Sequence, residues 1–425
     1  MKRCILPFVV LLACDRSEPA KPTEDAPAPA ADTKAAPTDT INDAFAAGPP
    51  TFIRGTAGNE TDDLRIATQV DLVRGLVFPG AAVKDDTEVG DAWPANPVVY
   101  GAPHRNRLIQ RLGDGALPGL EVADDRIRIG EQDFEGADLR LVALIPASES
   151  HPQFVYYAGT GPAGIAEINA GIPTGHAIVL ADRFGPLVTG SWQAQDGKLV
   201  PQLGKPARRI EYRSLAKPLP GFGGGSPATV RFAFPSMVAK SEADAERIDA
   251  AMRGLAQVVA KLQIASPVDL SVYLYPDRRS KQELTGNGGD GHAIASSNTL
   301  HVLALDAAAL ESLVAHEGTH VLGYHAVGPA ATPLVGEGMA VWVAGSYGGK
   351  TLAQWNVTLA PGEVTDLLGP GWMKAAEQHK YPRAAAAFGL AVDAVGLDEV
   401  GTHLMTATAE TWAERRKAAG LSPLE

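Results

Sequence analysis

The chain has 425 residues, of which 45% are hydrophobic and 20% are charged. This length and composition are typical of a globular protein with about two folded domains. The formal net charge at pH 7 is −12, and no segment of the sequence is rich in Lys and Arg. Because no basic patch is available to neutralise phosphates, the composition argues against nucleic acid and anionic lipid surfaces as partners.

The first residues have the pattern of a secretory signal. Lys2 and Arg3 precede ten apolar residues at 4–13, too few to cross a bilayer as a helix. The segment Leu11-Leu-Ala-Cys14 resembles the lipobox of bacterial lipoproteins. This resemblance implies removal of residues 1–13, lipidation of Cys14, and an extracytoplasmic protein of the bacterial cell envelope that is attached to the membrane through this lipid only. The alternative is an ordinary secretory signal cleaved nearby.

The cysteine count agrees with this interpretation. Cys4 and Cys14 are the only cysteines of the chain. The first would be removed with the signal and the second lipidated, so the mature protein is expected to contain no disulfide.

Three segments follow the signal. Residues 14–50 are rich in Ala, Pro, Asp and Thr and have few large apolar side chains, so a disordered tether is expected there. Residues 51–215 are expected to form a small α/β domain of unknown role, because apolar runs and helical patterns alternate. Candidate strands lie at 97–100, 139–145, 154–158 and 177–181, and a helix is expected at 105–112. Residues 216–227 are dense in Pro and Gly and are predicted to be a linker.

A glycine motif in the first domain raises an alternative function. Gly159-Thr-Gly161-Pro-Ala-Gly164 fits the G-x-G-x-x-G fingerprint of dinucleotide-binding proteins and follows a candidate strand. The helix after it is short, and an exported protein has little access to NAD. A tight strand-to-helix turn explains the glycines equally, so no bound nucleotide cofactor is expected.

The second domain is expected at residues 228–425. An amphipathic helix is predicted at 242–262, with Ser241 as its N-cap. Strands are predicted at 268–275 and 299–305, with a glycine-rich connection at 286–291 between them. The second strand leads into a helix that carries the main motif.

This motif is His316-Glu-Gly-Thr-His320, which fits H-E-x-x-H. Residues four apart on an α-helix lie about 40° apart around the axis and about 6 Å apart along it. Both imidazoles can therefore reach one Zn²⁺ ion, and Glu317 can act as general base toward the attacking water. The alternative is a pair of structural histidines.

Glu337 is the candidate third ligand. Gly323 is expected to end the motif helix, and Gly328-Pro329 with Pro333 predict a turn. Glu337 would then begin a second helix that packs back on the first. A carboxylate there completes the two-histidine, one-glutamate set of catalytic zinc sites and leaves a position for water. Otherwise Glu337 would be a surface charge.

A competing ligand scheme uses His325. The pattern from His316 to His325 nearly fits the metzincin motif H-E-x-x-H-x-x-G-x-x-H. The last histidine falls one residue early, at 325 where the pattern requires 326. The scheme with Glu337 is therefore preferred.

Residues 313–343 resemble gluzincin metallopeptidases, particularly bacterial peptidase-MA-like domains. These have a similar H-E-x-T-H helix followed by an apolar helix that starts E-G-x-A. The resemblance extends over about 268–404, including the strand-like segments 268–275, 291–294 and 301–303. It implies an α+β zincin-like catalytic domain that binds zinc, with a peptide substrate along an edge strand above the metal.

Tyr381 begins a segment that resembles the helix after the metal site in M1-type gluzincins. That resemblance implies that Tyr381 donates a hydrogen bond to the oxyanion; alternatively, it anchors a core helix. The chain departs from related patterns at Gly318, where a bulkier residue is usual, and at Val341, where thermolysin-like enzymes have an aspartate. The M1 aminopeptidase motif G-x-M-x-N is absent.

Together these patterns predict a small α/β domain followed by a zincin-like domain that hydrolyses a peptide or protein substrate. The main alternative is a catalytically degenerate zincin that acts as a binding or scaffold lipoprotein. A further possibility is that the N-terminal domain is a ligand-binding module.

Overall fold

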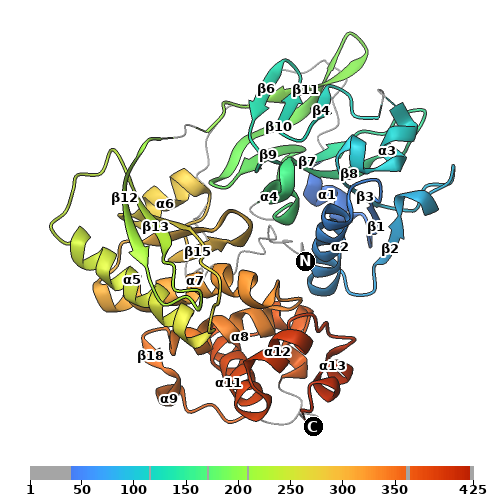
Figure 1. The fold of residues 1–425 in the computed structure, drawn as a ribbon. Coiled ribbons are helices and arrows are strands. Elements are labelled where there is room, and N and C mark those ends of the chain that lie inside the picture. The colour runs from blue at the N-terminus through green and yellow to red at the C-terminus, as the bar shows by residue number, and fades with distance from the viewer. Residues whose placement is uncertain (1–39, 114–115, 170–171, 208–209, 360–363, 422–425) are drawn as a thin grey trace.

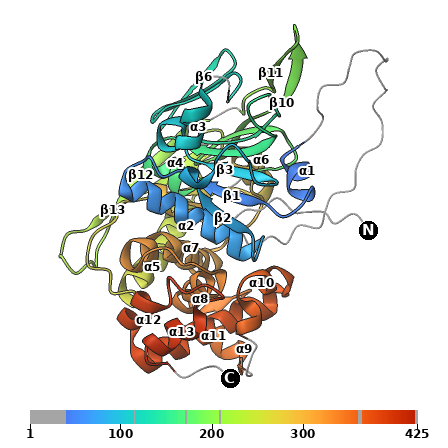
Figure 2. The ribbon, with the colours of Figure 1, turned by 90° about the vertical axis from the view of Figure 1, so that its right-hand side faces the viewer.

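The computed structural model describes residues 40–113, 116–169, 172–207, 210–359 and 364–421 (Figure 1). The expected signal peptide, Cys14 and most of the expected tether lie outside these residues. The buried apolar side chains form two separate cores, one between Ile41 and Trp192 and the other between Leu219 and Leu421. The chain therefore has two domains, and Figure 2 shows the N-terminal one above the helices of the C-terminal one.

The ordered part begins earlier than the sequence suggests. Helix α1 (Ile41–Ala46) is capped by Thr40, whose side chain accepts a hydrogen bond from the backbone N–H of Asp43, and Ile41 is fully buried. The prediction of disorder up to residue 50 is therefore wrong for this helix. Its two large apolar side chains, Ile41 and Phe45, are too weak a signal to stand out in an Ala- and Pro-rich segment.

The N-terminal domain is built on an eight-stranded mixed sheet in the order β11-β10-β9-β7-β8-β3-β1-β2. Its strands are β1 (Thr51–Arg54), β2 (Ala82–Asp85), β3 (Pro97–Tyr100), β7 (Arg140–Ile145), β8 (Phe154–Gly159), β9 (Ile178–Asp182), β10 (Gly185–Gln195) and β11 (Lys198–Leu203). Strands β2, β1, β3 and β8 are parallel, and the others pair antiparallel.

The mixed α/β character expected for this domain is confirmed, and all four predicted strands are present to within about one residue. Helices α2 (Glu60–Leu76), α3 (Arg107–Leu112) and α4 (Gly161–Ala166) connect the strands. The sequence patterns miss the small sheet of β4 (Leu120–Val122), β5 (Arg126–Ile129) and β6 (Gln132–Glu135). The domain is thus larger and more elaborate than expected.

Backbone packing accounts for the glycine motif. A Cβ on Gly159 would lie 2.5 Å from the carbonyl of Gly164, and Gly161 has φ +52 with its Cβ position 2.7 Å from the carbonyl oxygen of Ala137. Any larger residue would push α4 away from the neighbouring backbone. The glycines therefore serve the strand-to-helix turn.

The C-terminal domain contains a five-stranded sheet in the order β12-β13-β14-β16-β15. Its strands are β12 (Tyr212–Leu219), β13 (Ala228–Pro235), β14 (Leu270–Tyr275), β15 (Gly291–Ile294) and β16 (Thr299–Leu303). Strands β13, β14 and β16 are parallel, while β12 and β15 are antiparallel edge strands.

The expected domain boundary at 215/216 is wrong. Strand β12 pairs with β13 from Tyr212 to Leu219, so these residues belong to the second sheet and not to the first domain or to a linker. Pro218 suggested a loop, but an edge strand tolerates proline because one side of it needs no N–H donors.

Helices cover this sheet and extend below it (Figure 2). They are α5 (Asp244–Lys261), α6 (Arg278–Thr285), α7 (Ala307–Val327), α8 (Pro333–Ala344), α9 (Leu352–Trp355), α10 (Pro370–Lys374), α11 (Glu377–Val395), α12 (Leu397–His403) and α13 (Trp412–Ala418). Two short strands, β17 (Ser346–Tyr347) and β18 (Lys350–Thr351), form a hairpin after α8. Among the described residues, no helix combines the length and apolar composition needed to cross a membrane.

Two predicted helix ends differ from the structure. Helix α5 begins at Asp244 with Ala243 at its N-cap, and the Ser241 hydroxyl accepts only a local hydrogen bond from the N–H of Ala243. Helix α7 does not end at Gly323 but continues to Val327, before Gly328 with φ +85. A Cβ on Gly323 would lie 2.6 Å from Cε of Met339, so this glycine makes room for α8.

Candidate metal centre

Three side chains from α7 and α8 converge at one point. The Nε2 atom of His316 lies 3.2 Å from one oxygen of Glu337, and Nε2 of His320 lies 3.1 Å from the other. The two Nε2 atoms are 3.4 Å apart. All three ligand atoms lie within 4.8 Å of one another, a spacing suited to a single metal ion.

Local sequence features fix where α7 and α8 begin. The side chain of Asp306 caps α7 by accepting a hydrogen bond from the N–H of Ala309. After Gly328 the chain turns back, and Pro333 occupies the first turn of α8, where its missing N–H is not needed. Glu337 therefore lies one turn inside α8, not at its start as the sequence suggested, and faces the two histidines of α7.

The surroundings of the Glu337 carboxylate are those expected of a metal ligand. The residue is 0% exposed, and neither oxygen has a hydrogen bond of normal geometry among the described residues. A buried ionised carboxylate without such partners is strongly unfavourable. A divalent cation held by two imidazoles and a carboxylate would compensate for this, and that donor set is the one used by catalytic zinc sites.

The electrostatics of the metal-free site point the same way. Burial raises the pKa of Glu337, but His320 and His316 outweigh it and lower that pKa to about 2. Burial lowers the pKa of His320, but the Glu337 carboxylate outweighs it and raises that pKa to about 9. The site thus carries an imidazolium beside a carboxylate, and a metal would replace the proton.

Glu317 lies next to these ligands with a different environment. It is 2% exposed, and burial raises its pKa despite the opposing effect of His316 and His320. Its carboxylate packs against β15, where a Cβ on Gly291 would lie only 2.6 Å from Oε1 of Glu317. The edge strand is therefore shaped around this side chain.

The unusual Gly318 in the motif has a packing explanation. A Cβ at this position would lie 2.8 Å from Cδ2 of Leu255 on α5. Helices α5 and α7 approach each other so closely that a side chain at 318 would separate them. The glycine costs helix propensity, roughly 0.5–1 kcal/mol relative to Ala, but permits this contact.

Tyr381 lies beside the metal centre within an aromatic cluster. It is the fifth residue of α11 and is 2% exposed. Its ring stacks on Tyr347 with 4.5 Å between centroids, meets the edge of Trp372 at 5.3 Å, and lies 6.5 Å from the His316 ring. The position is thus close to the site and also part of the core.

His325 is not part of the metal cluster. It is exposed near the end of α7, and its Nε2 forms a 2.6 Å hydrogen bond with Oδ1 of Asn298. The cluster found among the described residues consists of His316, His320 and Glu337. The metzincin-like ligand scheme is therefore not supported.

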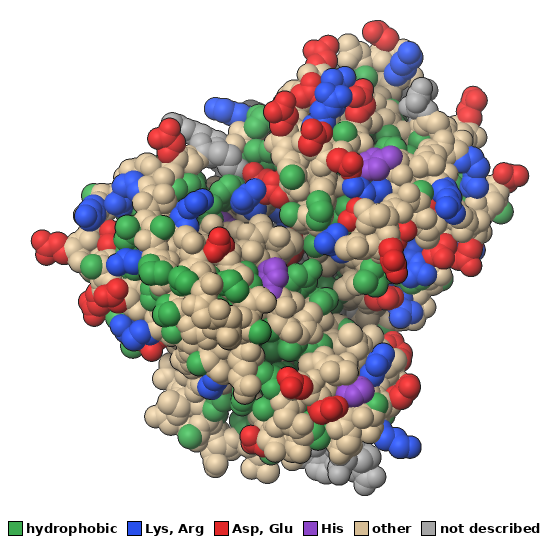
Figure 3. Space-filling view, in the orientation of Figure 1, with side chains coloured by type: hydrophobic (Ala, Val, Ile, Leu, Met, Phe, Trp, Pro, Cys, Tyr) green, Lys and Arg blue, Asp and Glu red, His purple; other side chains and the backbone are tan. Residues whose placement is uncertain are grey.

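A cavity of about 370 Å³ opens beside the metal centre. Glu317, His320 and Glu337 line one side, and residues of α2 and α4 from the N-terminal domain line the opposite side. In Figure 3, hydrophobic side chains gather in the hollow between the upper and lower parts of the molecule. The domain interface thus forms the approach to the site.

No sequence pattern predicted this second wall of the cavity. Helix α2 places Ile66, Val70 and Val73 in the core, while Leu64 and Leu72 lie on the cavity side. Apolar residues on two faces of a short surface helix are a signal for a second contact surface. Glu167, the other missed residue, has no sequence pattern that would single it out.

No protein-family model matches this chain, and no curated protein matches its sequence. Its structural neighbours include an M1 zinc metallopeptidase from Deinococcus radiodurans, with a TM-score of 0.30 and 14% identity over 56% of this chain and 56% of that chain. A mutant of that metallopeptidase bound to a Tyr-Ser-Ala substrate gives a TM-score of 0.27 and 13% identity over 56% of this chain and 55% of that chain.

A further neighbour is a two-domain M1 zinc metallopeptidase mutant bound to L-arginine, with a TM-score of 0.28 and 14% identity over 56% of this chain and 61% of that chain. The chain thus spans less than two thirds of each of these solved structures. Its structural neighbours are M1 zinc metallopeptidases, at low similarity.

Proposed function

We propose that this chain is a zinc-dependent peptidase that cleaves peptide bonds in the cavity between its two domains. The observation that carries the proposal is the buried carboxylate of Glu337, which has no normal hydrogen bond within the described part of the chain and faces the Nε2 atoms of His316 and His320. Zinc bound there would supply a Lewis acid for the scissile carbonyl and for a water molecule.

The residues around the ion have distinct tasks in this proposal. Glu317 accepts the proton of the attacking water and delivers it to the leaving amine. Its raised pKa suits both steps, because the carboxylate then binds the proton more readily than an exposed glutamate does. Tyr381 donates a hydrogen bond from its hydroxyl to the developing oxyanion. The two histidines and Glu337 would hold the ion, and the cavity beside them would admit a substrate.

The test is cleavage of a quenched fluorescent peptide library by the purified zinc-loaded protein. We expect Glu317→Gln to lower kcat by at least about a hundredfold, within the range of general acid–base catalysis, while zinc content stays the same. Glu311→Gln on the same helix is the matched control and should leave cleavage unchanged. Peptide binding without cleavage by the wild-type protein would instead support the degenerate scaffold.

We also propose that Cys14 carries a lipid that holds the protein at the bacterial cell envelope. The support is the lipobox-like Leu11-Leu-Ala-Cys14 segment. In cells given labelled palmitate, the wild-type protein and Cys4→Ser should both incorporate label and partition into detergent. Cys14→Ser should lose both properties. Equal labelling of the Cys14→Ser protein would contradict the anchor without affecting the peptidase proposal.

A further inference from the structure

We propose that the N-terminal domain forms one wall of the substrate cleft and that Glu167 on this wall binds a cationic nitrogen group of the substrate, an ammonium or a guanidinium. This inference rests on the proposed peptidase function and gives it a substrate preference. It also assigns a role to the N-terminal domain, for which the sequence indicates none.

The cavity is shared by the two domains. Leu64, Thr68 and Leu72 of α2 line it together with Glu167, which follows α4 directly, and the metal-site residues lie on the other side. Leu64 is 66% exposed, one of the few large apolar side chains left open to solvent in the described part of the chain. A substrate that occupies this cavity would therefore contact α2 and Glu167.

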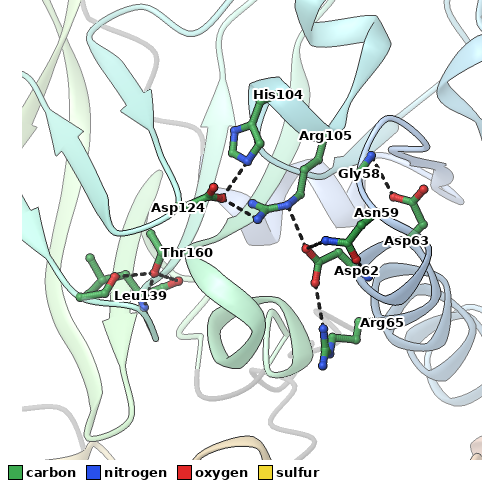
Figure 4. Close-up of polar contacts among 11 residues, drawn as sticks. Gly58, Asn59, Asp62, Asp63, Arg65, His104, Arg105, Asp124, Leu139 and Thr160 are labelled. Carbon is green, nitrogen blue, oxygen red and sulfur yellow. Dashed lines mark hydrogen bonds and ion pairs between the residues drawn. The ribbon is translucent and has the colours of Figure 1, made fainter.

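Buried polar contacts hold the α2 part of this wall in place (Figure 4). Asp62 of α2 is 3% exposed and forms an ion pair with Arg105 at 3.4 Å. Arg105 in turn binds Asp124 at 2.5 Å. Because this network lies inside the N-terminal domain, α2 presents its cavity face as a rigid surface.

The α4 part is held in a similar way. The hydroxyl of Thr160, at the N-cap of α4, donates to the carbonyl of Gly136 at 2.7 Å and accepts from the N–H of Leu139 at 2.9 Å. Figure 4 shows Thr160 and Leu139 side by side at this point. Glu167 is therefore the C-cap residue of α4, a helix whose N-terminus is held by the hydrogen bonds of Thr160.

The carboxylate of Glu167 has little compensation for its surroundings. Its side chain accepts a long hydrogen bond, 3.4 Å from the N–H of Ser296. Burial raises its pKa, and the nearby positive charge of Arg140, together with the backbone and side chain of Ser296, lowers it by smaller effects. Arg140, however, directs hydrogen bonds to the main-chain carbonyls of Glu167 and Asp182.

The arginine among the described cavity-lining residues is paired with another carboxylate. Arg65 of α2 lines the same cavity, but its guanidinium is paired with Asp62 at 2.8 Å (Figure 4). No ion pair to the side chain of Glu167 occurs within the described residues. A partly desolvated carboxylate facing an apolar cavity gains most from a charged donor, and a substrate cation is such a donor.

The experiment uses zinc-loaded full-length protein and matched peptides from one efficiently cleaved sequence. One series replaces each Lys or Arg by the uncharged norleucine, and the other acetylates the N-terminus. We expect one of these changes to lower kcat/KM by roughly tenfold to a hundredfold in the wild-type protein, as for loss of one charged hydrogen bond. The series that responds identifies the source of the cation.

Glu167→Gln should remove this preference, so that its ratio of kcat/KM for the charged and neutral peptides falls to about one. Glu131→Gln, an exposed carboxylate on the turn between β5 and β6, is the matched control and should retain the preference. Cleavage by the wild type without any dependence on peptide charge would overturn the inference. An unchanged preference in Glu167→Gln would also overturn it.

These outcomes are separate from failure of the proposed function. A wild-type protein that binds no zinc or cleaves no peptide contradicts the peptidase proposal itself. If Glu167→Gln loses zinc or its folded far-UV spectrum, the comparison of charged and neutral peptides on the wild type still decides whether a cation is recognised. A Glu167→Asp protein, with the charge retained, then tests whether Glu167 is the recognising group.

Discussion

Glu317 on α7 and Glu337 on α8 are both buried, but their surroundings shift their pKa values in opposite directions. Glu337 faces two imidazoles, which lower its pKa to about 2. Burial dominates at Glu317 and raises its pKa. The first carboxylate is thus a permanent anion suited to hold a metal, and the second can take up and release a proton.

A substitution at Gly291 would test whether catalysis depends on the exact position of the Glu317 carboxylate. An added Cβ there would lie 2.6 Å from Oε1 of Glu317 and 2.8 Å from Leu313. We predict that Gly291→Ala displaces the carboxylate and lowers kcat by about tenfold to a hundredfold, since small misplacements of a catalytic group are costly, with zinc content unchanged. Gly75→Ala, where no atom lies within 4 Å of the added Cβ, is the control.

The pKa of His320 predicts a pH dependence of zinc binding. Its raised pKa of about 9 in the metal-free protein means that zinc must displace a proton at neutral pH. The apparent affinity should therefore rise by up to about tenfold per pH unit from pH 6.5 to 9 and then level off. Titration calorimetry in several buffers would detect the released proton. An affinity independent of pH would contradict this protonation state.

The same groups affect the stability of the metal-free protein in opposite pH ranges. The raised pKa of His320 contributes stability that is present below pH 6.5 and is lost as pH rises through about 9. The lowered pKa of Glu337 contributes stability that is present above pH 4.5 and is lost as pH falls through about 2. Chemical denaturation from pH 6 to 10 should therefore show a loss at alkaline pH, which saturating zinc reduces.

At the scale of elements, glycines set the distances between helices. Gly323 of α7 leaves room for Met339 of α8, and Gly338 of α8 lies against Ala384 of α11, with 2.6 Å between its Cβ position and that carbonyl oxygen. These contacts bring Glu337 toward the histidines of α7. The metal centre therefore depends on helix packing as well as on the motif.

Gly323→Ala should destabilise the protein by about 1–3 kcal/mol, the usual cost of overpacking, because the new methyl group meets Cε of Met339. Met339→Ala removes that atom, so the double variant should recover part of this loss. Urea denaturation of the four proteins measures the coupling, expected to exceed about 0.5 kcal/mol. Additive effects of the two changes would show that this contact does not limit the helix spacing.

Sequence patterns predict several short buried strands and the motif helix of this chain, but they miss the long elements α2 and β10. The strands at 97–100 and 154–158 and the helix with His316 are present because continuous apolar runs and helical spacing act locally. Helix ends were less predictable. Gly323 suggested a stop, but its role is set by Met339, which approaches from another helix and leaves no trace in the local sequence.

At the scale of the whole molecule, the cavity depends on how the two domains meet. The spacing of His316, His320 and Glu337 is visible in the sequence because the motif helix fixes two of them. Leu64 and Glu167 reach the same cavity only through the tertiary arrangement. No local pattern could place them there.

The two cores predict that zinc stabilises the domains unequally. Because the candidate metal ligands all lie on α7 and α8 of the C-terminal domain, zinc at about a hundred times its Kd should stabilise that domain by about 2.7 kcal/mol. Calorimetry should show its transition shifting upward, with a much smaller shift for the N-terminal domain. Glu337→Gln should remove the shift. Equal shifts of both transitions would indicate that the domains unfold as one unit.

We infer that two imidazoles and one carboxylate hold a single zinc ion with a position left for water. X-ray absorption at the zinc edge of the purified protein tests it most directly. We predict one zinc per chain with four N or O ligands at about 2.0–2.1 Å, and loss of that coordination sphere in Glu337→Gln. An absence of stoichiometric zinc, or an unchanged coordination sphere in Glu337→Gln, would contradict the account.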